Sequence, residues 1–201
     1  GNYSITVNPS SVATGSTNVT LSFTIYNNSA NTIDNINFNF PDPSWNGWYQ
    51  STTYSCSDGN SNWNYAGGTY TANGNSSIAT GQNCTFNIRF SNVPTVTNDT
   101  TEIFYPDLYT GGTYRTSLLS LVTITAYSLT LSHAPAGPIN ADGTAAYTMT
   151  ATLTRISDGS PLANRTVVFS TTAGTLSSAT AVTNASGQAV VTLTAPVSST
   201  N

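Results

Sequence analysis

The residue types that most often perform chemistry are scarce in this sequence. His133 is the sole histidine, in the sequence SHAP, and nothing in the sequence places an aspartate and a reactive serine around it. General acid–base and nucleophilic catalysis need a base near neutrality beside a nucleophile. We therefore interpret His133 as a loop residue. The carboxylates that could form a glycosidase pair are spread over the chain: Asp42, Asp58, Asp99, Glu102 and Asp107. The sequence predicts a protein that is not an enzyme and has no cofactor.

Metal ligation is equally unpromising. A calcium site needs several oxygens from one loop, whereas Asp142-Gly143 and Asp158-Gly159 are single Asp-Gly pairs that turn chemistry explains. Cys56 and Cys84 are the only cysteines, and two thiols in a Thr- and Asn-rich chain of extracellular type are most simply one disulfide. Such a bond contributes about 3 kcal/mol by chain-entropy arguments. We predict a Cys56–Cys84 disulfide and no metal site.

One stretch, Trp45–Tyr70, concentrates the aromatic residues beside Gly and Asn. Its members are Trp45, Trp48, Tyr49, Tyr54, Trp63, Tyr65 and Tyr70. If exposed, these rings would form a platform on which sugars stack, and the chain would be a glycan-binding adhesin. If buried, they are the core of a region tied down by the disulfide, which is the interpretation we favour. The two alternatives differ in the exposure of the rings.

Charge is unusually low. Only 6% of the residues are charged, the formal net charge is −4, and all four basic residues are arginines. So few titrating groups predict a stability that changes weakly with pH. Four scattered arginines form no nucleic-acid footprint. We interpret the composition as that of a secreted protein, with solubility provided by Ser, Thr and Asn.

Glycosylation is predicted from Asn-x-Ser/Thr sequons, since a chain with little charge needs another source of solubility. No signal peptide or membrane-spanning run is present, so we interpret the chain as a mature product. The sequons begin at Asn2, Asn18, Asn27, Asn75, Asn83, Asn98, Asn164 and Asn184.

The elements that position these residues are predicted to be strands throughout. No helical period is sustained, while apolar residues alternate with Thr, Ser and Asn in short runs bounded by Gly, Pro and Asn, which is typical of half-buried strands. The clearest runs are Gly1–Asn8, Val19–Tyr26, Ile33–Phe40, Asn83–Phe90, Glu102–Tyr109, Ser117–Ala126, Tyr127–Leu131, Ala146–Leu153 and Gln188–Ala195. The predicted fold class is all-β.

The second half resembles the invasin/intimin-type bacterial immunoglobulin-like domain. The resemblance lies in ADGTAAYTMTATLTR (Ala141–Arg155), SPLANRTVVFSTTAGTLSSAT (Ser160–Thr180) and NASGQAVVTLT (Asn184–Thr194). In that family a turn and one further strand normally follow VVTLT, and this sequence lacks them. The resemblance implies a domain with an open groove.

An internal echo indicates tandem domains. YSITV (Tyr3–Val7) and YSLTL (Tyr127–Leu131) are each followed by a Pro, a turn Gly and a strand of Thr alternating with apolar residues. We predict two tandem immunoglobulin-like β-sandwiches, of which the second lacks its last strand. The expected divisions are a strand at residues 1–8, a disulfide-containing domain at 9–126 and an Ig-like domain at 127–201.

A groove flanked by unpaired strands is an aggregation hazard in a monomer and an assembly joint when a neighbour's strand fills it. We predict that the donor is the N-terminal strand of a neighbouring subunit: Asn2, Tyr3, Ser4, Ile5, Thr6 and Val7. The predicted walls of the acceptor groove are Leu129, Leu131, Val167, Phe169, Ala189, Val191 and Leu193. The alternative is that Tyr3–Val7 is the first strand of its own domain and that the second domain is truncated or closed by a swapped internal strand.

A contact between different surfaces that does not close into a ring builds a filament. This combination of two small β-sandwiches, a donor strand and many sequons is similar to archaeal thread filament subunits. The resemblance implies an extracellular, cell-surface homopolymer of identical, N-glycosylated subunits, with no nucleic acid and no membrane span. The alternatives are a glycan-binding adhesin that uses the Trp45–Tyr70 segment, and a module of a larger surface layer.

Overall fold

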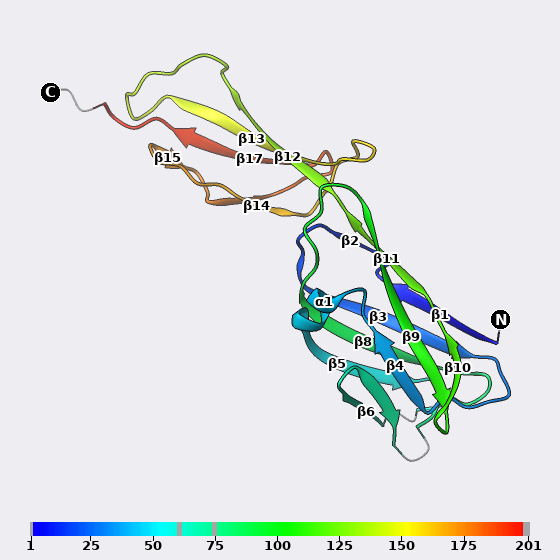
Figure 1. The fold of residues 1–201 in the computed structure, drawn as a ribbon. Helices are drawn as coiled ribbons and strands as arrows, with labels where there is room; N and C mark the ends of the chain where they lie inside the picture. The colour runs from blue at the N-terminus through cyan, green and yellow to red at the C-terminus, as the bar shows by residue number, and fades with distance from the viewer. Residues whose placement is uncertain (1, 60–61, 74–75, 199–201) are drawn as a thin grey trace. The chain divides into compact units, whose positions relative to one another are not determined.

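The computed structural model describes residues 2–59, 62–73 and 76–198. The chain divides into two compact units: unit 1 is Gly1–Thr125 and unit 2 is Ala126–Asn201. The division lies beside residue 126, where the sequence places a domain boundary, and residues 1–8 fall in unit 1. The predicted all-β class is confirmed, because strands make up both units and the helix among the described residues is short (Figure 1).

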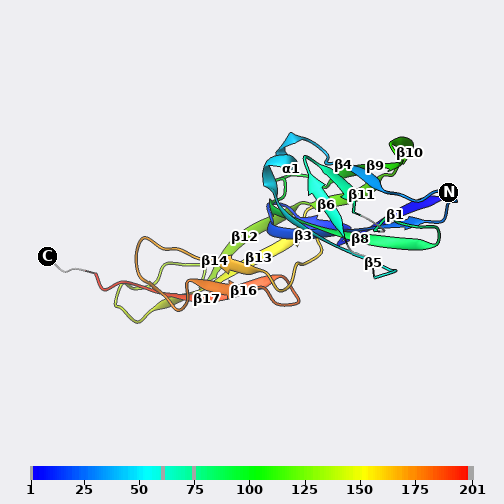
Figure 2. The same cartoon turned by 90° about the horizontal axis from the view of Figure 1, so that it is seen from below.

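Unit 1 is a sandwich of two sheets. The first sheet has the order β1-β3-β8-β5, formed by β1 (Tyr3–Asn8), β3 (Thr17–Asn27), β8 (Gln82–Asn92) and β5 (Tyr49–Cys56). The second has the order β2-β11-β9-β4-β7-β6, formed by β2 (Ser11–Ala13), β11 (Ser120–Thr125), β9 (Thr100–Thr110), β4 (Asn35–Asn39), β7 (Thr69–Ala72) and β6 (Trp63–Ala66). β10 (Thr113–Ser117) also pairs with β9. Figure 2 shows β3 and β8 in one layer and β4 and β9 in the other.

The core of unit 1 follows from the period-2 alternation of its strands. In β3, Leu21, Phe23 and Ile25 are fully buried and alternate with Ser22 and Thr24, because successive side chains of a strand point to opposite faces. The ring of Phe23 lies 4.9 Å from that of Phe38 and 5.0 Å from that of Phe104, both of which come from the opposite sheet. Each sheet therefore covers the inner face of the other.

The aromatic segment contains one element that the sequence did not predict, the helix α1 (Pro43–Trp48). Asp42 caps it by accepting a hydrogen bond from the Ser44 amide at 2.8 Å, and Pro43 suits the first helical position because its missing N–H would be unpaired there. The helix buries Trp45 against Phe90 and Phe104. The predicted disulfide is present: Cys56 and Cys84 are opposite residues of β5 and β8.

Unit 2 has a larger and a smaller sheet. The larger has the order β12-β13-β17-β15, formed by β12 (Tyr127–Ala134), β13 (Ala146–Arg155), β17 (Gln188–Thr194) and β15 (Thr175–Leu176). The smaller pairs β14 (Thr166–Val168) with β16 (Thr180–Val182). Residues 127–131 and 146–153 pair antiparallel in β12 and β13, as β1 and β3 do in unit 1, so the echoed sequences occupy equivalent places.

Candidate functional site

Of the seven residues predicted to wall the acceptor groove, Val167 and Phe169 lie in and directly after β14 of the smaller sheet, and the other five lie on the inner face of the larger sheet of unit 2. The pairing register of β12, β13 and β17 aligns its side chains in cross-strand rows: Leu129–Leu153, Leu131–Ala151–Ala189 and His133–Met149–Val191. Members of such rows, taken from alternate positions of each strand, share one face of the sheet. These rows are apolar except for His133, and Arg155, paired with Tyr127, lies on the same face beyond the Leu129–Leu153 row.

Part of this face is closed. Val167 of β14 is 8% exposed and packs with Ala151 and Ala189, whose exposed fractions are 2% and 1%. Val191 on the next row is 4% exposed. The small β14–β16 sheet therefore covers the part of the larger sheet that β13 and β17 form.

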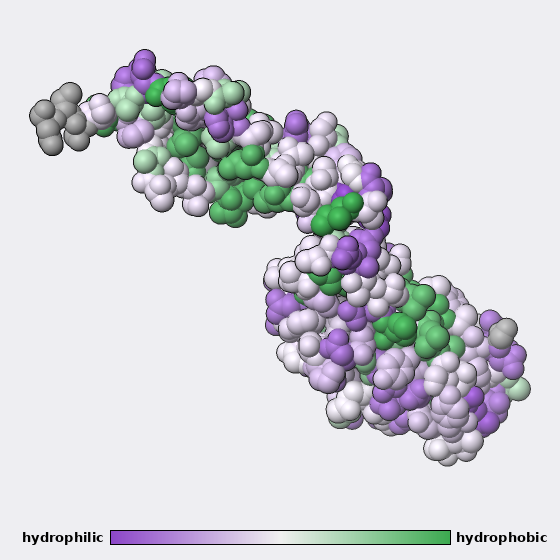
Figure 3. Space-filling view, turned by 45° about the horizontal axis from the view of Figure 1, so that its top comes forward, coloured by the Kyte–Doolittle hydropathy of each residue, from purple (hydrophilic) through white to green (hydrophobic). Residues whose placement is uncertain are grey.

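The remaining part, over β12, is open. Leu129 is 57% exposed and Leu131 61% exposed, although Leu131 lies in the same row as the buried Ala151. Among the described residues β12 pairs only with β13, and β14 only with β16, so each keeps an unpaired edge. Figure 3 shows apolar side chains reaching the surface of both units. The site is thus an apolar strip with unpaired backbone edges beside it, which is the geometry that a further strand needs.

The predicted groove residues divide between these two parts. Val167, Ala189 and Val191 belong to the closed core, and Phe169 and Leu193 are half-buried. Only Leu129 and Leu131 are open. The sequence analysis missed Met149 and Leu153, which lie on the same face; the alternation in residues 146–155 could have identified them.

The structure places the predicted donor residues in their own unit. Tyr3–Asn8 forms β1, an edge strand paired antiparallel with β3 along its whole length. The Tyr3 hydroxyl accepts a hydrogen bond of 2.7 Å from Ser29 Oγ, and Tyr3, Ile5 and Val7 pack on the core of unit 1. This arrangement is the alternative weighed from the sequence, a first strand of its own domain. A donor role would require β1 to leave β3.

The aromatic segment is core rather than a sugar platform. Trp45 and Tyr70 are fully buried and Trp63 is 2% exposed. Burial raises the pKa of the Tyr65 hydroxyl to about 12, with a smaller contribution from neighbouring Tyr49. Burial also raises the pKa of Tyr70, against a hydrogen bond with Thr52 that lowers it. The buried interpretation holds for these three rings, and the other four, Trp48, Tyr49, Tyr54 and Tyr65, are half-buried and pack on the same core.

The groups considered for catalysis are divided between the units: His133 is in unit 2, whereas Asp42 and Glu102 are in unit 1 and interact through their charges. His133 Nδ1 lies 2.9 Å from the carbonyl oxygen of Pro135, and its ring packs edge-on against Tyr147 at 4.7 Å. Asp42 caps α1. The pKa of Glu102 on β9 is raised, first by burial and then by the negative charge of Asp42. Within residues 2–59, 62–73 and 76–198, no three His, Cys, Asp or Glu side chains gather as metal ligands would.

The sequons differ in accessibility. Asn27 is fully buried, and its side-chain amide donates to the carbonyl oxygens of Asn31 and Ile78 at 2.7 and 2.8 Å, so it has a structural role. Asn83 is half-buried, and Asn75 lies outside the described residues. The exposed sequon asparagines are Asn2, Asn18, Asn98, Asn164 and Asn184. None of the described helices has the length and hydropathy to span a membrane.

The second half of the chain matches a known protein family. Residues 129–201 match the bacterial Ig-like domain (group 1), which supports the immunoglobulin-like resemblance predicted for the second half. Comparison with curated proteins gives no significant match.

Among solved structures, the chain is similar to the D0–D1 domain of intimin, at 19% identity and a TM-score of 0.31, over 95% of this chain and 83% of that one. It is also similar to the adhesin FdeC of Escherichia coli (16%, TM-score 0.36) and the adhesin InvE of Yersinia pseudotuberculosis (15%, TM-score 0.32). In both comparisons the aligned region covers 98% of this chain, but only 56% of FdeC and 52% of the InvE chain. Similarities this distant carry no conclusion about function.

Proposed function

We propose that this chain is a structural, non-enzymatic β-sandwich subunit of an extracellular surface assembly, joined to identical subunits by β-strand addition at unit 2. The observation that carries the proposal is the exposure of Leu129 and Leu131 on a face whose adjoining residues, Ala151 and Ala189, are buried. The disulfide suits an oxidising, extracellular environment. The bacterial Ig-like match over residues 129–201 supports the same class of protein.

The energetics require a whole strand rather than a side-chain contact. Full burial of an exposed leucine contributes about 1.5–3 kcal/mol, and each new backbone hydrogen bond a net of about 0.5–1.5 kcal/mol. Association costs about 4–15 kcal/mol in lost freedom. Leu129 and Leu131 alone therefore do not hold two molecules together, whereas an added strand that also pairs with the open edge of β12 or β14 does.

The head-to-tail filament predicted from the sequence is the second candidate, and it is the specific form of this assembly in which β1 is the donor. Tyr3, Ile5 and Val7 alternate with polar residues, as a strand inserted over an apolar strip must. Donation has a cost, because β1 must give up its pairing with β3 and the Tyr3–Ser29 hydrogen bond. The two candidates differ only in the identity of the donor.

Light scattering and electron microscopy of the purified chain test the assembly. We expect concentration-dependent self-association that the double variant Leu129→Lys/Leu131→Lys abolishes. The matched control is Val168→Lys/Val182→Lys, which places the same charges on the opposite, outer face of the small sheet, where both side chains are already exposed. A wild-type chain that remains monomeric at high concentration would refute assembly between copies, as would equal loss of association in both variants.

A peptide with the sequence of residues 1–8 identifies the donor. If β1 is the donor, an excess of this peptide occupies the acceptor groove and shortens the assemblies. The same peptide with Ile5→Asp should have no effect, because a charge would be placed against the apolar strip. Inhibition by neither peptide, with association still abolished by Leu129→Lys/Leu131→Lys, would exclude the filament form and leave strand addition by another donor.

A further inference from the structure

The outer face of the second sheet of unit 1 carries a regular polar array. In β4 the buried residues Ile36 and Phe38 alternate with Asn35, Asn37 and Asn39, which point away from the core and are half-buried. The strand thus places an amide at every second residue on one face. Side chains from the neighbouring strands β9 and β7 extend this series of asparagines into rows across the sheet.

The row through Asn35 crosses the sheet. Asn35 pairs with Tyr109 of β9 on one side and with Thr71 of β7 on the other, and Tyr114 of β10 pairs with Tyr109. The rings of Tyr109 and Tyr114 meet edge to face at 5.8 Å. At about 4.8 Å between strands, the row is long enough for several sugar rings.

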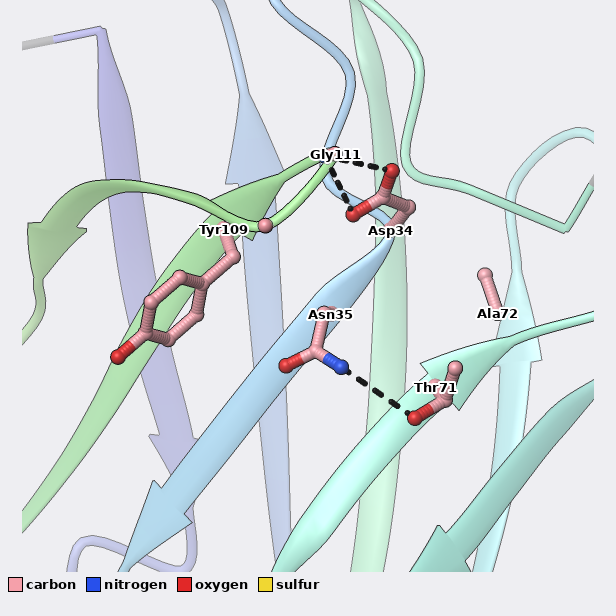
Figure 4. Close-up of a pocket in the computed structure, with 7 residues that line it drawn as sticks. Asp34, Asn35, Thr71, Ala72, Tyr109 and Gly111 are labelled. Carbon is pink, nitrogen blue, oxygen red and sulfur yellow. Dashed lines mark hydrogen bonds between the residues drawn. The ribbon is translucent and has the colours of Figure 1, made fainter.

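A hollow of about 550 Å³ lies along this row. It is lined by Asp34, Asn35, Thr71, Tyr109 and the turn Gly111–Gly112, with Ala72 at its edge. Figure 4 shows Tyr109, Asn35 and Thr71 side by side on three neighbouring strands, with Asp34 beside the turn. A tyrosine, an amide and a hydroxyl therefore line one open depression of ligand size, and the Tyr109 ring extends from it along β9 on the side away from Asn35.

The hydrogen-bonding groups of the hollow are partly committed and partly available. Both carboxylate oxygens of Asp34 accept from the Gly111 amide, at 3.1 and 2.9 Å, and Asn35 Nδ2 donates to Thr71 Oγ1 at 3.3 Å. Asn35 Oδ1 and the Tyr109 hydroxyl have no hydrogen-bond partner among the described residues. An acceptor and a phenol that both donates and accepts are thus left for a ligand.

We propose that this hollow binds a neutral oligosaccharide, with a sugar ring stacked on Tyr109 and its hydroxyls hydrogen-bonded to Asn35 and Thr71. Sugar hydroxyls both donate and accept, which matches amide and hydroxyl side chains, and an aromatic face accommodates the apolar face of a sugar ring. Anionic ligands are disfavoured, because Asp34 lies in the hollow and none of its lining residues is basic. The site is separate from the buried Trp45–Tyr70 rings and does not depend on assembly through unit 2.

Binding to an array of neutral and acidic oligosaccharides, followed by calorimetry with the best neutral hexasaccharide, tests the site. The chain should carry Leu129→Lys/Leu131→Lys, so that self-association does not add avidity. We expect Tyr109→Ala and Asn35→Ala each to weaken binding about tenfold, a loss typical of a central contact. Tyr109→Phe should retain most of the affinity, since it keeps the ring. Tyr26→Ala removes an exposed tyrosine from the other sheet of unit 1 and should change nothing.

Three results would overturn the proposal: no neutral oligosaccharide bound on the array, binding confined to acidic sugars, or equal affinity in Tyr109→Ala, Asn35→Ala and Tyr26→Ala. Far-UV circular dichroism of each variant excludes misfolding as the cause of a loss. Because the replaced side chains lie on the outer face of the sheet, the core beneath them is unchanged.

Discussion

Unit 1 and unit 2 begin with the same sequence pattern, but the inner face of the first sheet is covered by a second sheet much more completely in unit 1 than in unit 2. In unit 1, Phe23 on the first sheet meets Phe38 and Phe104 on the second, and all three are at most 2% exposed. In unit 2, the described buried core cluster consists of Ala151, Val167 and Ala189. Two extended facing sheets bury large aromatic side chains, whereas the short β14–β16 pair covers only small ones.

The difference shows that an alternating strand specifies which side chains share a face but not what covers that face. Leu21 of β3 and Leu131 of β12 both follow the alternating pattern, yet one is fully buried and the other is 61% exposed. Burial is therefore a property of the opposite layer. In unit 1 that layer is the sheet β2-β11-β9-β4-β7-β6, and in unit 2 the described residues supply only part of it.

The largest expected difference concerns one inward-facing apolar side chain in each unit, which is buried in unit 1 and exposed in unit 2. Phe86 of β8 is fully buried against the rings of Trp63 and Tyr70. Phe86→Ala should lower the free energy of unfolding of unit 1 by about 3–5 kcal/mol, because it leaves a cavity among these rings. Leu131→Ala should change that of unit 2 by no more than about 0.5 kcal/mol in the monomeric chain, as at other exposed positions. Denaturant unfolding followed through both transitions measures the two values; equal losses would mean that Leu131 is covered in solution.

The second-largest expected difference between the units comes from the disulfide, which lies in unit 1. Reduction, or the double variant Cys56→Ala/Cys84→Ala, should destabilise unit 1 by about 3–4 kcal/mol, from the loop entropy that the bond removes from the unfolded chain. Unit 2 contains no cysteine, so its transition should not move. A shift of both transitions would indicate that the units unfold as one cooperative body.

Backbone geometry gives an intermediate effect confined to unit 2. Gly187 has φ +74°, and a Cβ there would lie 2.4 Å from the carbonyl oxygen of Leu153. We expect Gly187→Ala to lower the free energy of unfolding by about 2–3 kcal/mol, because the strain of a positive φ and the clash with the Leu153 carbonyl oxygen add together. Gly159, with φ +71° and open space around it, is the matched control at about 1 kcal/mol. Thermal unfolding of both variants provides the comparison, and similar losses would contradict the clash.

The smallest expected effects are those of pH, and they have opposite sign in the two units. Asp142 accepts hydrogen bonds from the backbone amides of Ala145 and Thr144 and from the Thr144 hydroxyl, which hold the pKa of this exposed carboxyl below 3.8. The hydroxyl and the amide of Ser160 likewise hold the pKa of the exposed Asp158 carboxyl below 3.8. Their contribution to unit 2 is therefore present above pH 3.8 and lost in stronger acid.

In unit 1, burial raises the pKa of Tyr65 to about 12 from an ordinary 10.0. Its contribution is intact below pH 10 and lost between pH 10 and 12, where the unfolded chain ionises first. Equilibrium unfolding at pH 2–12 should show unit 2 weakening in acid and unit 1 in alkali. The reverse order would mean that other groups control both transitions.

The sequence by itself determined the fold class, most of the strands, the Cys56–Cys84 disulfide and the faces on which apolar residues lie. These follow from local rules: period-2 alternation, turn residues, and the presence of only two cysteines. The alternation in residues 35–39 likewise places Asn35, Asn37 and Asn39 on one face. The short helix α1 was not predicted, because the Asp42–Pro43 cap is a brief signal inside a segment that otherwise alternates.

Only the tertiary structure decided what covers each face. It placed Tyr3–Asn8 on β3 of its own unit, buried Trp45 and Tyr70, and left Leu129 and Leu131 open beside the buried Ala151. It also brought Asn35, Thr71 and Tyr109 into one row, although they are distant in the chain. Lateral strand order and the extent of the opposite layer are set by contacts between distant residues, which no local pattern encodes.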